Sequence, residues 1–394
     1  MTQNRWLLPE GIEEALPVQA QRLESFRRRL LDLYHSWGYE LVMPPFIEYV
    51  ESLLAGMGSD MDLQTFKLTD QLSGRSLGVR ADMTPQVARI DAHMLKRDAP
   101  ARLCYLGTVL HARPEVTGGT RSPLQLGAEL YGHSGADSDI EIVGLMLETL
   151  RTMSFTSVHL DLGHVGIYRN LALRAGLDAT QESALFDMLL RKALPEIREY
   201  LQGADIPGEF RDMFLALAEL NGGAEVIAQA RRTLSGAGPD VEQALDYLET
   251  VAQGVKSRAQ DIDLCFDLAE LRGYHYHTGV VFAAFVPGHG QELARGGRYD
   301  DIGKSFGRAR PATGFSADLR ALLDLSPAKH DVPVHGIFVP QPDDATAQAE
   351  IRRLRASGER VICSLSGQQG GAREAGCDRK LVKREQQWIV VEVE

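Results

Sequence analysis

The feature that most constrains the fold is a long helix-forming segment between two blocks with strand patterns. From Ile167 to about Val255, Ala, Leu, Glu and Arg dominate, and the strand signals of the flanking segments vanish. The short apolar runs Val158–Leu162 and Leu264–Leu268 on either side are typical of strands. The chain is therefore predicted to be an α+β protein with a helical insertion at residues 167–255.

Length and charge limit the class of protein. A chain of 394 residues is too long for one compact domain and fits two or three. The formal net charge is −12, whereas a protein that binds a polyphosphate backbone usually carries a basic surface. Nucleic-acid binding is therefore not favoured, although a local basic patch stays compatible with this charge.

The N-terminus and the cysteines favour a cytoplasmic protein. No basic stretch followed by an apolar run begins the chain, so no signal peptide is expected. The longest apolar runs, such as Val280–Phe285, are too short to span a bilayer. The cysteines lack metal-ligand or CxxC spacing, so reduced thiols, no metal site and no cofactor are expected. They are Cys104, Cys265, Cys363 and Cys377.

Ahead of the insertion, one helix and several strands are predicted. Apolar residues at helical spacing predict a helix from Pro17 to Trp37. The strand Tyr39–Glu48 is broken at Pro44-Pro45, because proline has no N–H to donate to a sheet. Two candidate strand pairs follow, the first around a turn and the second around a long glycine-bearing loop. These are Thr65–Thr69 with Leu77–Arg80, and Leu103–Val109 with Leu124–Tyr131.

A polar linker near the C-terminal end separates a small block from the rest. Val280–Phe285 is predicted as a strand and Ala317–Leu325 as a helix, and the proline-bearing linker Ser326–Pro333 follows. Beyond it, the pattern predicts the strand Gly336–Val339, the helix Asp344–Ala356 and the strands Arg360–Leu365 and Gln387–Val393. Two domains are therefore predicted, a core at residues 1–325 and a truncated α/β domain at residues 334–394.

Six segments follow one another as they do in histidyl-tRNA synthetases. Gly38–Glu48 resembles class II motif 1, and Tyr105–Gly107 with Gln125–Glu129 resembles motif 2. The remaining matches are Leu8–Trp37 to the family's entry segment, Val79–Pro85 to its Arg-Pro-Glu-Gly-Thr segment, Leu271–His277 to its Arg-Gly-Leu-Asp-Tyr-Tyr signature, and Gly296–Asp300 with Pro311–Phe315 to the approach to motif 3.

The resemblance covers most of the chain, from Leu8 to Leu325. Each segment is weak by itself, but their common order and nearly matching spacing make the resemblance specific. It implies a class II aminoacyl-tRNA synthetase-like core, in which helices flank an antiparallel sheet. It also implies that the helical insertion lies between motifs 2 and 3 and that motif 1 builds a homodimer.

The resemblance further implies a pocket for free histidine. An ammonium needs a carboxylate there, because a buried cation without a partner is costly. An imidazole needs polar partners for its nitrogens inside an aromatic wall. The matching positions are Asp82 and Glu129 for the ammonium, Thr84 and Gln125 as neutral partners, Tyr276, His277 and Tyr299 around the imidazole, and Arg272 near the substrate carboxylate.

Each candidate also has a purely structural interpretation. Tyr276 and Tyr299 are compatible with half-buried strand tyrosines, and Arg272 is compatible with a solvated surface residue. His277 could be a core residue, and Asp82 could cap the helix that follows it. The pocket interpretation is preferred because these residues fall together on the family's pattern.

Two departures from the family signature affect the imidazole side of the pocket. His275 stands where the family has an Asp, and Thr278-Gly279 stands where it has Asn-Arg. The identity of the ligand and its affinity therefore stay open.

The phosphate side of the implied active site lacks its motif 2 arginine. Formation of an aminoacyl adenylate needs fixed cations at the α-phosphate. An ungapped alignment between Gly107 and Gln125 puts His111 at the arginine position and Arg113 at the glutamate position. A shift of two residues would use Arg113 and Glu115 instead, but it requires compensating gaps on both sides.

The motif 3 arginine is also displaced. Ala321 occupies its position, and Arg320 stands one residue earlier, which is about 100° round a helix of 3.6 residues per turn. Loss of one preorganised contact to a transition state can reduce a rate by about 10² to 10³. Loss of both argues against ligase chemistry, so no catalytic residue and no aminoacylation activity are expected.

This profile resembles the HisZ subfamily, the histidyl-tRNA synthetase-like regulatory subunits of short-form ATP phosphoribosyltransferase. The resemblance implies a hetero-oligomer with a separate catalytic subunit, which needs the regulatory subunit for the first step of histidine biosynthesis. It implies feedback by histidine as effector and, with the C-terminal domain truncated, no tRNA partner. The alternatives are a divergent ligase that activates an amino acid with ATP, and a dimeric scaffold with an unused pocket. Histidine could also bind at a subunit interface.

Overall fold

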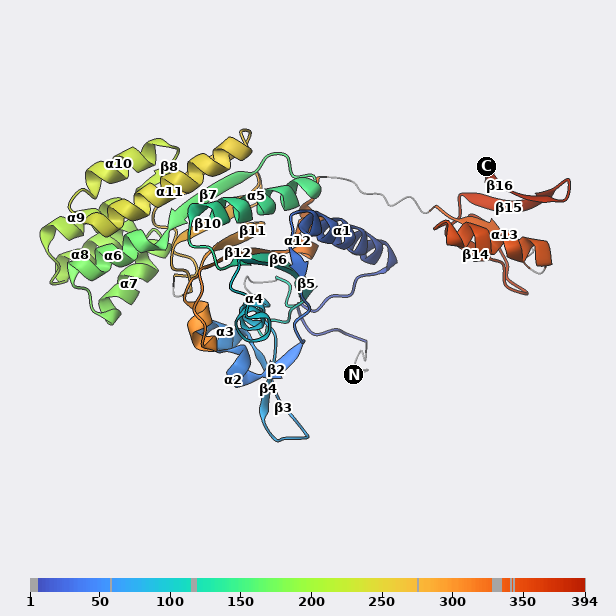
Figure 1. Cartoon of the computed structure of the whole chain (residues 1–394), viewed down its shortest axis with the longest axis horizontal. Coiled ribbons are helices and arrows are strands. Elements are labelled where there is room, and N and C mark those ends of the chain that lie inside the picture. The colour runs from blue at the N-terminus through green and yellow to red at the C-terminus, as the bar shows by residue number, and fades with distance from the viewer. Residues whose placement is uncertain are drawn as a thin grey trace. The chain divides into compact units, whose positions relative to one another are not determined.

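Nine strands form the central sheet of a large core unit. The computed structural model describes residues 6–56, 59–114, 119–274, 276–327, 335–340, 342 and 344–393, and the chain divides into two units, Met1–Ala328 and Lys329–Glu394 (Figure 1). In spatial order the central sheet contains β1 (Glu40–Leu41), β5 (Ala101–Thr108), β6 (Leu124–Tyr131), β12 (Ala312–Asp318), β11 (Ala294–Arg298), β10 (Val280–Phe285), β7 (His159–His164), β9 (Asp263–Asp267) and β8 (Asn221–Gly222). Only the pairs β1–β5 and β7–β9 among these are parallel. The predicted α+β class with an antiparallel sheet is therefore confirmed.

The two prolines end one strand and let the chain enter a second sheet. β1 precedes Pro44-Pro45, and β2 (Ile47–Tyr49) follows them. β2 pairs with β4 (Ser76–Val79), which also pairs with β3 (Phe66–Thr69), so a small antiparallel sheet results. The short helices α2 (Val50–Leu53) and α3 (Ser59–Gln64) stand between β2 and β3.

Three helices form the core's main apolar layer against the central sheet. α1 (Pro17–Ser36) packs against α5 (Ala136–Thr152) and α12 (Leu319–Leu325), and α5 also packs against β12. The first of these helices matches the prediction closely. Helix α5 was not predicted, although Ile142, Val143, Leu145 and Met146 along it are fully buried. Its apolar residues lie on more than one face, so its pattern lacks the one-sided period of a surface helix.

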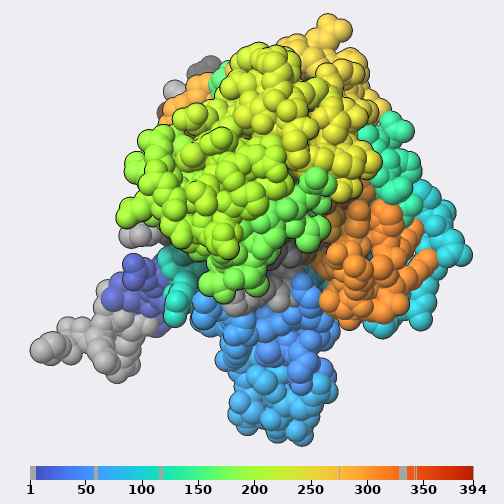
Figure 2. All heavy atoms as spheres, turned by 90° about the vertical axis from the view of Figure 1, so that its left-hand side faces the viewer, coloured from blue at the N-terminus to red at the C-terminus, as the bar shows by residue number. Residues whose placement is uncertain are grey.

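The helical insertion is confirmed as a bundle of six helices with one short strand. The helices are α6 (Val165–Ala175), α7 (Ala179–Leu190), α8 (Leu194–Gly203), α9 (Gly208–Leu217), α10 (Glu225–Thr233) and α11 (Pro239–Arg258). Asp178 and Gln181 form a capping box at the start of α7. The side chain of each residue accepts a hydrogen bond from the backbone N–H of the other. Strand β8 interrupts the helical pattern and pairs with β9. Figure 2 shows the insertion helices as one continuous surface above the small β2–β4 sheet.

The segment that leads into motif 3 differs from its prediction. Ala317 and Asp318 end β12, and the predicted helix begins only at Leu319, so the expectation of helix from Ala317 is wrong. The Asp318 carboxylate accepts a hydrogen bond from the backbone N–H of Arg320, which fixes the start of the helix after Asp318. Short helical segments elsewhere in the core are α4 (Thr84–Arg89), the π-helix η1 (Ile90–Leu95) and the 3-10 helix η2 (Ile302–Phe306).

The C-terminal unit is a four-stranded sheet with one helix. β14 (Val361–Cys363), β13 (Ile337–Val339), β15 (Arg379–Arg384) and β16 (Gln387–Glu392) lie in that order, and α13 (Ala345–Ala356) packs on them. Strand β15 was not predicted, because its alternation of charged and apolar residues is weak. The other elements of this unit match their predictions within two residues.

No helix within the described ranges combines the length and apolar character that crossing a membrane requires. Within the same ranges, no group of three or more His, Cys, Asp or Glu side chains is placed to hold a metal ion. The cytoplasmic location and the absence of a cofactor stay predictions.

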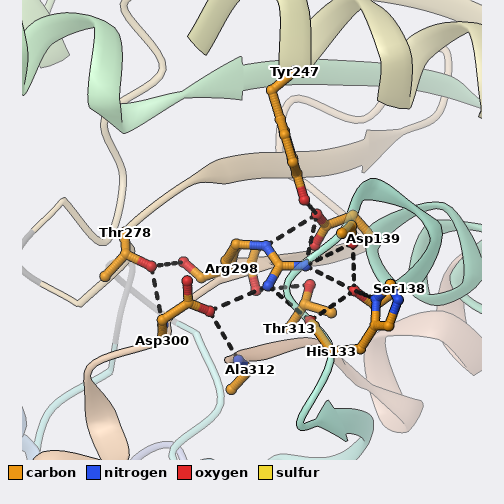
Figure 3. A network of polar contacts seen from close by, with 11 residues as sticks. His133, Ser138, Asp139, Tyr247, Thr278, Arg298, Asp300, Ala312 and Thr313 are labelled. Carbon is orange, nitrogen blue, oxygen red and sulfur yellow. Dashed lines mark hydrogen bonds and ion pairs between the residues drawn. The ribbon is translucent and has the colours of Figure 1, made fainter. Parts of the chain in front are cut away.

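A buried ion pair joins the central sheet to α5 and to the insertion (Figure 3). The Arg298 guanidinium at the end of β11 donates from Nη2 to Asp139 Oδ2 of α5 at 2.9 Å, and the two side chains are 5% and 0% exposed. Tyr247 of α11 donates its hydroxyl to the same oxygen at 2.6 Å. Arg298 also donates to the backbone carbonyl of His133 and to Ser138 Oγ, so it holds the start of α5.

Replacement of Asp139 by Asn should therefore destabilise the core. The guanidinium of Arg298 would lose its buried counter-charge and keep only the partly exposed carboxylate of Asp300, 3.2 Å from Nη1. Removal of one partner of a buried ion pair typically costs about 3–5 kcal/mol. Urea denaturation followed by circular dichroism measures this change. The matched control is Glu148→Gln, which breaks a half-exposed pair with Arg151 on the same helix and should change stability by less than about 1 kcal/mol. Equal effects of the two substitutions would contradict the role given to Asp139.

Candidate functional site

Glu129 places a carboxyl group inside the central sheet. It lies on β6 opposite Gly314 of β12, and its side chain is 1% exposed. A Cβ atom at position 314 would lie 1.5 Å from Glu129 Oε2, so only glycine leaves room for the carboxyl group. Gly127, two residues earlier on β6, similarly makes room for the hydroxyl of Tyr105, which a Cβ atom there would approach to 2.4 Å.

Hydroxyl groups, rather than cations, surround this carboxyl group. The Tyr105 hydroxyl donates to Glu129 Oε1 at 2.9 Å, and the Tyr299 hydroxyl donates to Oε2. Thr84 Oγ1 lies 3.0 Å from the Tyr105 hydroxyl and extends the network to the start of α4. Burial raises the pKa of Glu129 to about 8, despite the hydrogen bonds from the two tyrosines. The carboxyl group is therefore mostly protonated at neutral pH in the unliganded chain.

Asp82 forms a second acidic position beside this network. Its Oδ1 accepts hydrogen bonds from the backbone N–H of Thr84 and from Gln125 Nε2, both at 2.8 Å. Gln125 Oε1 accepts from the backbone N–H of Met83 at 2.9 Å. Asp82 thus accepts from the first residue of α4 but is not its N-cap, which is Met83, and Asp82 also orients Gln125 on β6. Both hydrogen bonds of its carboxylate use Oδ1.

Tyr276 covers the cluster from the loop between β9 and β10. Its ring stacks on Tyr299, with centroids 4.9 Å apart and an angle of 25° between the planes. Its hydroxyl is buried and has no hydrogen-bond partner among the described residues. Because a buried hydroxyl without a partner is unfavourable, this group is a candidate to bind a polar ligand.

His277 and Arg272 lie at the edge of this arrangement. The imidazole of His277 packs edge-on against Tyr276, at 5.3 Å between centroids. Burial lowers the pKa of His277 to about 4, so the ring is neutral at pH 7. Arg272 donates from Nε to Glu270 at 2.9 Å and from Nη1 to Glu292 at 2.8 Å. The predicted cation is therefore neutralised by two carboxylates and lies outside the Glu129 network.

The described structure thus brings seven of the eight predicted residues into one chain of contacts. They are Asp82, Thr84, Gln125, Glu129, Tyr276, His277 and Tyr299. The side chain of Arg272 pairs elsewhere, and only its backbone carbonyl lies near the group, 3.3 Å from His277 Nδ1. His275, which departs from the family signature, lies outside the described residues.

His111 and Arg113 occupy the motif 2 arginine and glutamate positions of the ungapped alignment. His111 is buried, and its Nε2 lies 3.0 Å from the backbone carbonyl of Ala81. Arg113 is exposed, while Glu115, its partner in the shifted alignment, lies outside the described residues.

The motif 3 region keeps one cation near the sheet. The half-buried Arg320 has its Nε and Nη1 buried without a hydrogen-bond partner among the described residues. The Asp318 carboxylate accepts from the backbone N–H groups of both Arg320 and Leu124, so the helix start lies beside the first residue of β6. Ala321, at the family's arginine position, is exposed.

Comparison with known proteins gives the family. A family model described as histidyl-tRNA synthetase matches residues 11–322, and one described as the ATP phosphoribosyltransferase subunit HisZ C-terminal domain matches residues 334–391. The ATP phosphoribosyltransferase regulatory subunit of Thioalkalivibrio sulfidiphilus is 63% identical over 99% of both chains. The chain belongs to the family of ATP phosphoribosyltransferase regulatory subunits. The protein of the same description from Pseudomonas aeruginosa is 56% identical and covers 99% of this chain and 98% of its own.

Solved structures agree with this membership. A Bacillus halodurans protein described as an ATP phosphoribosyltransferase regulatory subunit/histidyl-tRNA synthetase superposes with a TM-score of 0.83 at 27% identity, covering 93% of this chain and 94% of its own. The histidyl-tRNA synthetase of Nostoc sp. has a TM-score of 0.79 at 18% identity, covering 98% and 97%, which supports the fold alone.

Two tyrosines beside the Glu129 carboxyl group were not predicted from the sequence. Tyr105 supplies a hydroxyl donor to Glu129, and Tyr131 lies two residues beyond Glu129 and is 2% exposed. Side chains at i and i+2 share one face of a strand, so this period could have pointed to Tyr131. For Tyr105 the sequence held no local signal, because its partner lies 24 residues away on the neighbouring strand.

The raised pKa of Glu129 predicts a specific pH dependence of stability. The folded chain keeps the proton that the unfolded chain releases near pH 4.5, so this stabilisation is complete below pH 4.5 and is lost as pH rises to about 8. Glu129→Gln, which keeps a neutral group, should remove this loss. Urea denaturation at pH 5, 6.5 and 8 should therefore give a stability difference between wild type and variant that moves in favour of the variant as pH rises. A constant difference would mean that Glu129 titrates normally in the folded chain.

Proposed function

We propose that this chain is the noncatalytic regulatory subunit of a short-form ATP phosphoribosyltransferase. It is required for the activity of a separate catalytic subunit in the first step of histidine biosynthesis, and it makes that step sensitive to histidine. The observation that carries the proposal is the contrast between the two halves of the site. The polar groups for an amino acid form one connected network around Glu129, whereas His111 and Ala321 occupy the positions of the phosphate-binding arginines.

Histidine fits the chemistry of the network. Asp82 and Glu129 supply carboxylates for the ammonium, and Thr84 and Gln125 supply neutral partners. Tyr276, with its buried hydroxyl, faces the imidazole together with the other aromatic residues. A cation that enters beside Glu129 would lower the pKa of its carboxyl group, so binding near pH 7 would release a proton.

Arg272, the predicted partner of the ligand's carboxylate, is already paired with two carboxylates. The Arg272 guanidinium is held by Glu270 and Glu292 and is 39% exposed, so it would have to leave one of them to bind the ligand. This arrangement favours binding of a free amino acid by its ammonium and side chain. It does not favour the clamping of an activated phosphate.

Regulation follows if histidine binds two assembly states with different affinity. A ligand shifts an equilibrium between active and inactive assemblies only by the ratio of its affinities for them, typically about 1–3 kcal/mol. In this scheme the chain needs no chemistry of its own, and its effect on the catalytic subunit is one of assembly and conformation.

A homodimer through motif 1 has support from exposed apolar side chains. Leu41, Met43, Phe46 and Ile47 follow one another in this segment and are 40–75% exposed. An apolar surface of this kind is typical of a protein interface. For the absence of a tRNA partner, the support is the net charge of −12 and the match of residues 334–391 to the HisZ C-terminal domain.

Isothermal titration of L-histidine into the purified chain, alone and with its catalytic subunit, tests the pocket. We expect saturable binding, and Glu129→Lys should abolish both the binding and the histidine sensitivity of the complex. Glu148→Lys, a half-exposed position on α5, is the matched control and should bind as the wild type does. Unchanged inhibition in the Glu129 variant would indicate that histidine binds at a subunit interface instead. Absence of binding in both forms would leave a scaffold with an unused pocket.

ATP–pyrophosphate exchange separates the regulatory subunit from a divergent ligase. The ligase would need Arg113 and Arg320 as replacement cations, and the two Arg320 donors without a partner among the described residues favour it. We expect no exchange with histidine or any other amino acid, because His111 and Ala321 stand at the positions of the arginines that would bind the phosphates. Robust exchange that Arg320→Gln abolishes would overturn the proposal.

A further inference from the structure

The loop that carries Tyr276 and His277 begins with a tight turn. Gly273 has a φ of +69°, a region that side-chain-bearing residues rarely occupy, and its carbonyl accepts from the backbone N–H groups of Tyr276 and His277, both at 2.8 Å. At the far end of the loop, the backbone N–H of Thr278 donates to the carbonyl of Arg298 at 2.7 Å. The end of the loop is thus fixed to the sheet by its continuation into β10 and by the hydrogen bond of Thr278 to β11.

The helical insertion holds the middle of this loop. Arg169 of α6 donates from Nη2 to the backbone carbonyls of Tyr274 and His277, at 2.9 and 3.0 Å. Its guanidinium lies over the Tyr274 ring, 4.8 Å from the centroid. One charged group therefore joins two carbonyls that flank Tyr276, and it restricts where the Tyr276 ring can lie.

Tyr274 anchors the same loop inside the insertion. Its side chain is 4% exposed and packs against Tyr168 of α6 and Phe186 of α7, at 5.4 and 5.2 Å between centroids. Its hydroxyl donates to Glu182 of α7. The two tyrosines of the loop therefore lie in different surroundings. Tyr274 packs inside the insertion, whereas Tyr276 stacks on Tyr299 in the proposed pocket.

We propose that Arg169 is a positioning residue for the amino-acid pocket and that it couples pocket occupancy to the helical insertion. This inference rests on the proposed function, because it assumes that Tyr276 contacts a bound histidine. A ligand that fixes Tyr276 also restricts the backbone carbonyls of Tyr274 and His277. Because Arg169 donates to both carbonyls, the same ligand restricts the motion of α6. The insertion, which carries no residue of the pocket itself, acquires a role as the element that responds to histidine.

The affinity for histidine should depend on this contact. If the loop adopts the binding conformation for only about a tenth of the time, the apparent Kd rises about tenfold. Arg169→Gln removes the charge and the paired donation, whereas Arg169→Lys keeps a cation that can reach the carbonyls. We expect about tenfold weaker binding for Arg169→Gln and partial recovery for Arg169→Lys in isothermal titration. Arg198→Gln, at an exposed position on α8, is the matched control and should bind as the wild type does.

Hydrogen exchange measured by mass spectrometry distinguishes positioning from loss of structure. Arg169→Gln should speed exchange at residues 276–278 without changing exchange in α9 or α11. Histidine should slow exchange in α6 and α7 of the wild type but not in this variant. Faster exchange throughout the insertion would show that Arg169 has only a structural role. Wild-type binding and exchange in Arg169→Gln would refute the inference.

The two proposals can fail separately. If the wild-type chain binds no histidine alone or in complex, the proposed pocket is wrong, and the inference falls with it. If the wild type binds histidine and the variant binds it equally well, only the role of Arg169 is wrong.

Discussion

The organisation of the candidate site depends on one energetically unfavourable feature, the burial of the Glu129 carboxyl group in the central sheet. The described residues give this group two hydroxyl donors and no cation, so burial raises its pKa and keeps it protonated in the unliganded chain. Gly314 and Gly127 make room for it and for the Tyr105 hydroxyl. A buried carboxyl group is tolerated only when its neighbours form hydrogen bonds with it. The two tyrosines supply such hydrogen bonds, and a cationic ligand would add the missing counter-charge.

Two sets of polar contacts join the helical insertion to this sheet and to the loop that carries Tyr276. The buried pair Arg298–Asp139 connects β11 and α5 with Tyr247 of α11, and Arg298 is the residue before Tyr299. Arg169 connects α6 with the carbonyls beside Tyr276. Tyr299 and Tyr276, which stack on each other, are thus each held through a neighbour by a different helix of the insertion. Charged hydrogen bonds in a dry environment depend strongly on geometry, so such anchors fix positions better than apolar contacts do.

The residues proposed to recognise an amino acid lie together, whereas His111 and Ala321 stand at the positions of the phosphate-binding arginines. Asp82, Gln125 and Glu129 are oriented by hydrogen bonds within the unliganded chain, which lowers the cost of ordering them on binding. The nearest predicted cation, Arg272, is committed to Glu270 and Glu292. Transition-state stabilisation needs fixed charge at the reacting phosphate, whereas sensing needs only a difference in affinity between two states. A family of regulatory subunits is the setting in which this combination is useful.

The sequence by itself determined the class of fold, the helical insertion and the interruption at Pro44-Pro45, and it pointed to most residues that lie around Glu129. Periodicity, proline chemistry and the motifs can each be read along the chain. The sequence did not reveal β11 and β12, whose glycines Gly296, Gly297 and Gly314 weaken the strand pattern while they allow close approach of backbones and of Glu129. Tertiary structure alone decided that Tyr105 reaches Glu129, that Arg272 is neutralised, and that Arg169 holds the pocket loop. Each of these contacts joins residues 20 or more positions apart or depends on which of several carboxylates lies nearest, and no pattern along the chain encodes such a choice.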